Sequence, residues 1–410
     1  MYTQDDGFAM KQPPREGTFL HGVILAGTVI CGTLAPTVIG PVLPAMQFHF
    51  ASVPNIATLV PLIVTIPNLV LALFATGIGA VSDRMGRKMV LVLSLALYAL
   101  AGTAPLFLNS IPLILLTRAL VGVAEAAVMT ISTSLIGDYF TGSRRDRFAS
   151  VQVVFAATSA TVFNLVGGTL GAYGWRVPFA AYALPLLLLP LVCIYIWEPV
   201  KHRVDAPMVH RPVDGSAFRS WLLVAICLVA FAVGLFFMVM PVWLSFMAVD
   251  RGIHSTGMIG VAYAINSFGV VVGTVCFGWI LAKRVTIASQ FALGAFLTGV
   301  GFLLMGNSAT YSSLCIGGAI AGFGCGITLP ALISWGLRSL PVSKRGFGTG
   351  AFTSAQFAGY FVSPLVVGMG AGALGTRSLA ISFLGIVLLI VGALAFLGRV
   401  GVACRVTQRA

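Results

Sequence analysis

The sequence predicts an all-helical membrane protein with twelve transmembrane helices, arranged as two pseudo-symmetric bundles of six. Three observations lead to this prediction. Hydrophobic residues make up 58% of the chain and charged residues only 9%, a composition that excludes an ordinary soluble domain. Apolar runs of about 20 residues recur along the chain and are long enough to cross a bilayer. Similar residues also recur at an offset of about 200 positions, as expected for an internal repeat.

The apolar runs fall into two groups of six around a polar interval that contains Pro199, Pro207 and Pro212. Such an interval is typical of a linker. The first group covers residues 19–46, 54–81, 88–107, 111–138, 147–172 and 177–198. The second group covers residues 219–247, 255–282, 285–307, 311–337, 346–372 and 375–398. We therefore predict a leader at 1–18, a first bundle at 19–198, a linker at 199–218, a second bundle at 219–398 and a tail at 399–410.

The basic residues predict the orientation in the membrane. The net charge is +13, and nearly all Lys and Arg residues fall in loops on one side of the predicted helices. By the positive-inside rule, this side and both termini are cytoplasmic in an inner or plasma membrane. Division of the charge among short loops argues against a nucleic-acid surface. The seven cysteines show no C-x-x-C spacing and are interpreted as packing residues, with no metal site predicted.

A charged loop between the second and third helices carries a specific pattern. Its residues are Gly79, Asp83, Arg84, Gly86, Arg87, Lys88 and Leu91. The chain here resembles the G-x-L-a-D-r-x-G-r-k-x-x-l signature of the major facilitator superfamily, with Val81 and Ser82 as mild departures. The resemblance extends over essentially the whole chain and is nearest in character to bacterial twelve-helix drug/proton antiporter-like efflux permeases. It implies that the third, sixth, ninth and twelfth helices face lipid and that the other eight surround a substrate path.

The fourth helix contains two ionisable residues well inside a predicted span, Arg118 and Glu125. They are seven residues apart, which puts them on one face about 10 Å apart along the axis. Because a charge is costly in the membrane interior, we expect both side chains to face the central cavity.

Arg118 and Gly122 resemble the family's l-x-x-x-R-x-x-x-G motif, which is associated with proton coupling in many exporters. Glu125 is additional to that motif. Since burial and nearby cations change the protonation of a carboxylate, we predict that Glu125 carries protons. Arg118 would modulate it or anchor an anion. The alternative is a structural pair that joins the fourth helix to a neighbour.

Further residues are candidates for the cavity and for gating. The fifth helix keeps only Gly167 and Gly168 of the antiporter pattern G-x-x-x-G-P-x-x-G-G, which weakens the prediction of efflux. The candidate cavity residues are Thr33, Thr37, Asn68, Asn164, Phe236, Phe237, Met240, Asn266, Gln356 and Tyr360. Individually each is better explained by packing than by substrate contact, but together they describe an apolar pocket for amphipathic or aromatic compounds. Asp138 and Arg145 are predicted to join Asp83 in a charge network that gates the cytoplasmic side, with an ordinary interfacial ion pair as the alternative.

We predict proton-coupled export of a small hydrophobic or amphipathic compound by alternating access. The first alternative is uptake of an organic anion held by Arg118, and the second is a sensor or membrane enzyme that transports nothing. The second has little support, because the sequence shows no phosphate-binding loop, H-E-x-x-H or nucleophile elbow. No cofactor is implied. The expected partners are substrate, protons and lipid, and twelve helices in one chain make a monomer sufficient.

Overall fold

The computed structural model describes residues 17–199, 220–340 and 345–407, and this part of the chain is helical with no strands. The predicted leader and linker fall almost wholly on residues 1–16 and 200–219, outside the described residues. Eleven of the described helices are long and apolar enough to cross a membrane. A twelfth span is obtained if the bent pair Phe19–Leu34 and Pro36–His49 is one crossing. The all-helical membrane fold is therefore confirmed.

The first half begins with the bent segment α1 (Phe19–Gly27), α2 (Ile30–Ile39), η1 (Gly40–Val42) and α3 (Leu43–His49). The bend of 40° has a local cause. Pro36 lies inside α2 and Pro41 lies in η1, and each proline removes a backbone donor and crowds the preceding turn. The remaining elements are α4 (Ile56–Met85), α5 (Arg87–Thr103), η2 (Ala104–Leu106), α6 (Ile111–Tyr139), α7 (Gly142–Gly171), η3 (Val177–Ala183) and α8 (Pro185–Tyr195).

The second half repeats this order. Its elements are α9 (Ser220–Val249), α10 (Thr256–Cys276), η4 (Phe277–Leu281), α11 (Ala282–Arg284), α12 (Ile287–Gly306), α13 (Tyr311–Ser339), α14 (Arg345–Leu374) and α15 (Arg377–Thr407). The starting residues of α5, α6 and η3 (87, 111 and 177) recur 200 positions later as the starts of α12, α13 and α15 (287, 311 and 377). One expected boundary differs, because α15 continues to Thr407, beyond the predicted end at residue 398.

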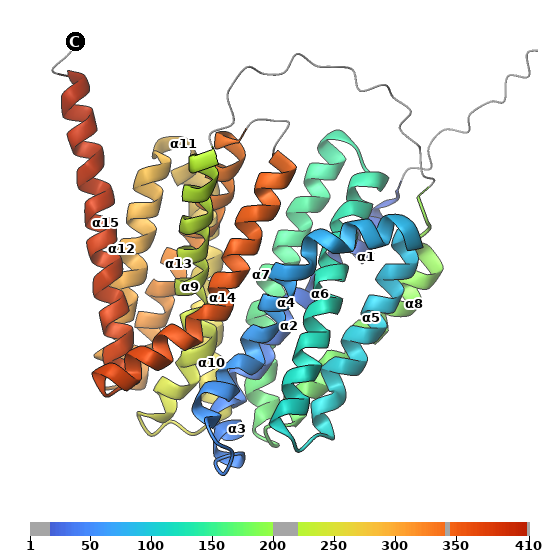
Figure 1. Ribbon diagram of the computed structural model, residues 1–410, viewed down its shortest axis with the longest axis horizontal. Helices are drawn as coiled ribbons and strands as arrows, with labels where there is room; N and C mark the ends of the chain where they lie inside the picture. Colours follow the sequence, from blue (N-terminus) through green and yellow to red (C-terminus); the bar gives the residue numbers. More distant parts are fainter. Residues whose placement is uncertain (1–16, 200–219, 341–344, 408–410) are drawn as a thin grey trace, which may run out of the picture.

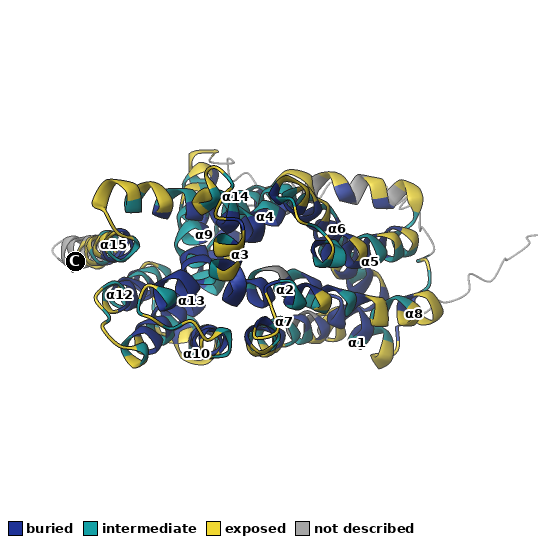
Figure 2. Cartoon of the chain, turned by 90° about the horizontal axis from the view of Figure 1, so that it is seen from below, coloured by how far each residue is buried: buried dark blue, intermediate teal, exposed yellow. Residues whose placement is uncertain are grey.

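The helices form two bundles that lie side by side (Figure 2). Across the border, α4 packs against α14 and α7 packs against α10. We call the end where α8 ends and α9 begins the terminal face. The other end, which holds α3 and the α9–α10 turn, is called the loop face (Figure 1).

Close helix approach within each bundle depends on glycine. A methyl group at Gly122 of α6 would lie 2.7 Å from Pro67 O of α4. The corresponding glycine of the second half, Gly322 of α13, would place a methyl group 2.3 Å from Asn266 O of α10. Real Cβ atoms do not come this near to a carbonyl oxygen, so both contacts require a residue without a side chain. The internal repeat therefore includes the close packing of the fourth helix of each half against the second helix of that half.

Replacement of Gly122 by alanine is expected to destabilise the first bundle. The methyl group would force α6 away from the backbone of α4, at a cost of about 1–3 kcal/mol. Gly77→Ala on α4 is the matched control, because a methyl group there meets no atom within 4 Å and alanine favours a helix. Thermal unfolding of the purified variants should show a lower midpoint for Gly122→Ala alone. Equal midpoints would contradict the packing argument.

Candidate functional site

Arg118 of α6 lies inside the first bundle. Its side chain is fully buried, and Nη2 donates hydrogen bonds to Ala101 O at 2.9 Å and Gly102 O at 3.0 Å. These carbonyls belong to the last turn of α5, where carbonyl groups lack partners within the helix. The arginine therefore caps the negative end of α5 with a positive charge.

Aromatic rings complete the enclosure of Arg118. Its guanidinium carbon lies 4.8 Å from the ring centre of Tyr182 and 5.2 Å from that of Phe179, both in η3. Such contacts favour the cation. The expectation that Arg118 faces the central cavity is therefore wrong: the side chain points between α5 and η3. The third and sixth helices do expose apolar side chains, but they also bury Tyr98 and Tyr182 completely.

Glu125, two turns further along α6, points toward the bent first segment. Its side chain is 4% exposed, and a methyl group at Gly32 of α2 would lie 3.6 Å from Glu125 Oε1. Among the described residues, Glu125 Oε2 has no hydrogen-bond partner and no cation forms an ion pair with the carboxylate. An ionised carboxylate in such a place carries a large desolvation cost, whereas the protonated acid does not.

Arg118 and Glu125 therefore do not form a direct pair. Tyr98 of α5 lies within electrostatic range of both groups. It stacks on Tyr182 with ring centres 5.4 Å apart and donates a hydrogen bond to Cys31 O of α2. The interior of the first bundle thus includes an enclosed arginine, two tyrosines and a carboxyl group that contacts the bent helix.

One candidate cavity residue joins the two bundles. Asn164 of α7 donates a hydrogen bond to Ser267 Oγ of α10 at 2.8 Å, and its Oδ1 is buried without a partner. Near it within the first bundle, Thr33 Oγ1 of α2 and Ser159 Oγ of α7 are 2.9 Å apart. One of these hydrogen bonds thus joins α2 to α7, and the other joins α7 to α10 of the second bundle.

The other candidate cavity residues mostly contact their own half. The hydroxyl of Thr37 donates to Thr33 O, the amide of Asn68 donates to Val64 O and the amide of Asn266 donates to Gly318 O. In the second half, Gln356 donates to the Tyr360 hydroxyl at 2.9 Å, and Tyr360 stacks on Phe237. Met240 is buried near Gly318. Gln356, Tyr360 and Phe237 thus lie together, whereas Phe236 lines a pocket inside the second bundle.

The two bundles meet tightly near the loop face. A methyl group at Gly168 of α7 would lie 2.7 Å from Thr256 O and 2.8 Å from Gly260 Cα, both of α10. At Gly40 of η1, it would lie 3.1 Å from the Tyr263 ring and 3.2 Å from Pro241 O. Such contacts leave no passage between these segments, so the loop face is closed along α7, η1, α9 and α10.

Gly168→Val is expected to hold the two bundles apart at the loop face. The valine side chain cannot occupy the space now taken by the α10 backbone, so the closed state loses stability. Spin labels at the exposed residues Tyr173 and His254 should then report a longer distance. Gly372→Val, where a methyl group meets nothing within 4 Å, is the control. An unchanged distance in both variants would count against this closure.

The charged loop joins three segments at the terminal face. Gly86 has φ +93°, a conformation suited to glycine. Arg87 forms an ion pair with Asp138 at the end of α6. Glu198 accepts the backbone N–H groups of Arg87 and Lys88, each at 2.8 Å, and so caps the N-terminus of α5.

The remaining predicted gating residues are less connected. The guanidinium of Arg145 lies over the end of α6, since a methyl group at Gly137 would be 3.6 Å from its Cζ. Arg84 is exposed. Gly79 and Asp83 fall within α4, but their side-chain positions lie outside the part of the chain that the structure describes.

Sequence reasoning missed several residues of these sites. Tyr98, Tyr182 and Phe179 went unnoticed because the third and sixth predicted helices are mostly apolar and were expected to face lipid. The tyrosine hydroxyls were the available signal, since a buried polar aromatic residue usually has a partner. Glu198 was taken only as the last residue of the sixth predicted helix, although an acidic residue beside a membrane border suits a helix N-terminus.

Known proteins resemble this chain over most of its length. The model of the Major Facilitator Superfamily matches residues 25–308. The bacillibactin exporter of Bacillus subtilis is 23% identical over 84% of this chain and 88% of its own length. The 3-(3-hydroxy-phenyl)propionate transporter of Escherichia coli is 25% identical over 73% of this chain and 75% of its own.

A solved structure supports the same fold. A bacterial homologue of the human lysosomal transporter Spinster, in an inward-facing and occupied conformation, superposes with a TM-score of 0.76 at 15% identity, covering 93% of this chain and 97% of the other. The family match, the repeated bundles and the charged loop agree. The chain belongs to the Major Facilitator Superfamily and is a multi-pass membrane transporter rather than an enzyme.

Proposed function

We propose that this transporter exports a small hydrophobic or amphipathic compound in exchange for protons, with both termini in the cytoplasm. The observation that carries the proposal is the carboxyl group of Glu125, buried in α6 against Gly32 and with Oε2 unpartnered. Any movement of the bent α1–α3 segment changes the surroundings of this group. Its protonation is therefore coupled to the position of a helix that contacts the second bundle.

The orientation follows from the charges. Arg87, Lys88, Arg145, Lys283 and Arg284 lie at the terminal face, which the positive-inside rule assigns to the cytoplasm. In this orientation, the tight contacts at Gly40 and Gly168 lie on the outer side, which supports closure there. A structure closed on the outer side is the state in which an exporter takes up cytoplasmic substrate.

The environment of Arg118 argues against the alternative of anion uptake. An arginine that anchors a substrate carboxylate has to be reachable from the cavity, whereas Arg118 is 0% exposed and is held by two carbonyl groups and two aromatic rings. The enclosed guanidinium instead stabilises the first bundle. The matching family members include both an exporter and a transporter of an aromatic acid. The choice between export and uptake therefore depends on the residues of this chain.

The proposal is tested with a pump-deficient bacterium that expresses the protein. Growth inhibition is measured over a broad panel of toxic compounds. Resistance to hydrophobic or amphipathic compounds, and quenching of a pH-gradient dye reversed by the same compounds in everted membrane vesicles, are expected. Resistance without a response of the pH gradient would refute proton coupling. No resistance at normal expression, combined with accumulation of an organic acid by intact cells, would refute export.

A further inference from the structure

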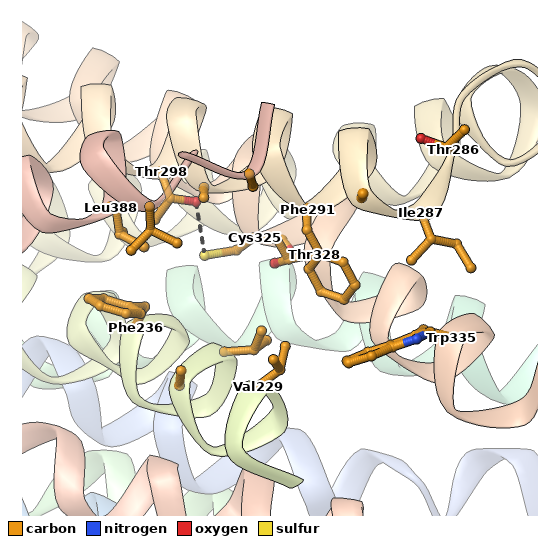
Figure 3. A pocket seen from close by; sticks show the side chains of 16 residues that line it. Val229, Phe236, Thr286, Ile287, Phe291, Thr298, Cys325, Thr328, Trp335 and Leu388 are labelled. Carbon is orange, nitrogen blue, oxygen red and sulfur yellow. Dashed lines mark hydrogen bonds between the residues drawn. The ribbon is translucent and has the colours of Figure 1, made fainter. Parts of the chain in front are cut away.

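The second bundle contains a pocket that the proposed proton and substrate path does not use. It has a volume of about 690 Å³ and lies among α9, α12, α13 and α15. Figure 3 shows Phe236 and Val229 on one side, facing Phe291 and Thr298 on the other. Its size is in the range of ligand sites. The lining is mostly apolar, and the hydroxyl of Thr298 already donates a hydrogen bond to Gly294 O of its own helix at 2.8 Å.

The internal repeat gives a reason why the second bundle is hollow at this place. At the 200-residue offset, Thr298 corresponds to Tyr98 and Ala295 corresponds to Leu95. In the first bundle, Tyr98 and Leu95 are both fully buried, and Tyr98 fills the space beside η3 and α2, where it stacks on Tyr182 and donates to Cys31 O. The smaller side chains of the second bundle leave that space open. An apolar cavity of this size in a membrane protein is stabilised when an apolar group fills it.

The pocket has the depth of one membrane leaflet. Its lining on α12 runs from Thr286 to Thr298, twelve residues or about 18 Å of helix. Half of the hydrocarbon thickness of a bilayer is about 15 Å. The pocket is also open to the side, because Val391 lines it and yet is 51% exposed. A hydrocarbon chain can thus enter from the lipid and lie along the pocket.

The mouth of the pocket at the terminal face is basic. Lys283 and Arg284 immediately precede the Thr286 end, and both side chains are exposed. Arg338 is also exposed and lies one turn beyond Trp335, which lines the same end. In the sequence, no acidic residue follows Asp250, which lies at the loop face. Each such cation attracts anionic headgroups of the cytoplasmic leaflet.

We propose that this pocket binds one acyl chain of an anionic phospholipid from the cytoplasmic leaflet, with its headgroup on Lys283 and Arg284. This lipid site is separate from the export function. It rests on the proposed function only in taking the terminal face as cytoplasmic. The chain would fill the space that tyrosine and leucine fill in the first bundle. Lipid binding can be measured without transport, so failure of this inference and failure of the export proposal are separate results.

The test uses the full-length protein in nanodiscs that contain phosphatidylglycerol with a photoreactive diazirine on one acyl chain. Cross-linked peptides are mapped by mass spectrometry, and phosphatidylcholine with the same label is the comparison. We expect labelling of the α12 and α13 residues that line the pocket. Ala295→Leu combined with Thr298→Tyr, which restores the side chains of the first bundle, should abolish this labelling. Ala393→Leu, on the exposed side of α15, is the control.

A second variant tests the headgroup without altering the bundle interior. Lys283→Gln with Arg284→Gln should reduce pocket labelling by phosphatidylglycerol about tenfold or more. It should leave phosphatidylcholine labelling unchanged, as should the exposed control Arg147→Gln for both lipids. Equal pocket labelling by the two lipids, or labelling only of exposed α15 residues in every variant, would overturn the proposal. Displacement of the label by an exported compound would make the pocket a substrate site and would also overturn it.

Discussion

Replacement of Glu125 by glutamine is expected to abolish proton-driven transport while substrate exchange continues. Glutamine keeps the size of the side chain and its burial against Gly32 but cannot release a proton. In proteoliposomes loaded with a substrate found by the resistance panel, a pH gradient should drive accumulation by the wild type only. Exchange of labelled for unlabelled substrate should proceed in both proteins, because it needs no net proton movement.

A control carboxylate makes this result specific. Asp250→Asn removes an exposed acidic group at the loop face that pairs with Arg377 at 3.1 Å, and surface pairs contribute little. This variant should retain pH-driven accumulation. Loss of exchange as well as accumulation in Glu125→Gln would show that the side chain has a structural role. Retention of both activities would remove Glu125 as the proton carrier.

Arg118→Ala is expected to cause the largest loss of stability of any single substitution considered. It leaves Ala101 O and Gly102 O without their charged donor and opens a space between the rings of Phe179 and Tyr182. The expected decrease in the free energy of unfolding is about 3–5 kcal/mol. Thermal unfolding in detergent and the yield of monodisperse protein measure this effect.

A surface arginine serves as the control, because it carries the same charge as Arg118 but is not buried. Arg338→Ala removes an exposed cation near the end of α13 and should change the unfolding midpoint very little. Similar midpoints for the two variants would contradict the structural role of Arg118. A normal midpoint for Arg118→Ala, together with a raised substrate KM, would instead favour an anion anchor in the cavity.

Much of the fold could be predicted from the sequence, because a bilayer imposes simple requirements. Helices such as α6 and α13 are visible as apolar runs of sufficient length, and the recurrence of similar residues about 200 positions apart predicts the repeat. The bend of the first segment was not predicted, although Pro36 and Pro41 could have indicated it. The end of α15 at Thr407 was not predicted. The predicted boundary was the end of the apolar run, but a helix can continue beyond the membrane into more polar sequence.

Less of the candidate site than of the fold could be predicted from the sequence. The importance of Arg118 and Glu125 followed from the cost of burying charge, which depends only on residue type and membrane depth. Their environments could not be predicted from the sequence. Helix periodicity places both residues on one broad face of the helix but does not show which neighbouring helix packs against each part of that face. Tyr98, Phe179 and Tyr182 come from other helices, and only the packing of η3 and α5 on α6 brings them to Arg118.

Hydropathy, charge and repeat spacing are local properties of the chain, so the class, the spans and the two interior charges of this transporter could be predicted from the residues alone. The folded structure was needed to show that Arg118 is enclosed, that Glu125 contacts the bent first segment and that Asn164 bonds to the second bundle. It was also needed to show that the space filled by Tyr98 in one half is open beside Thr298 in the other. These properties depend on which side chains, distant in the sequence, pack against one another in the folded protein.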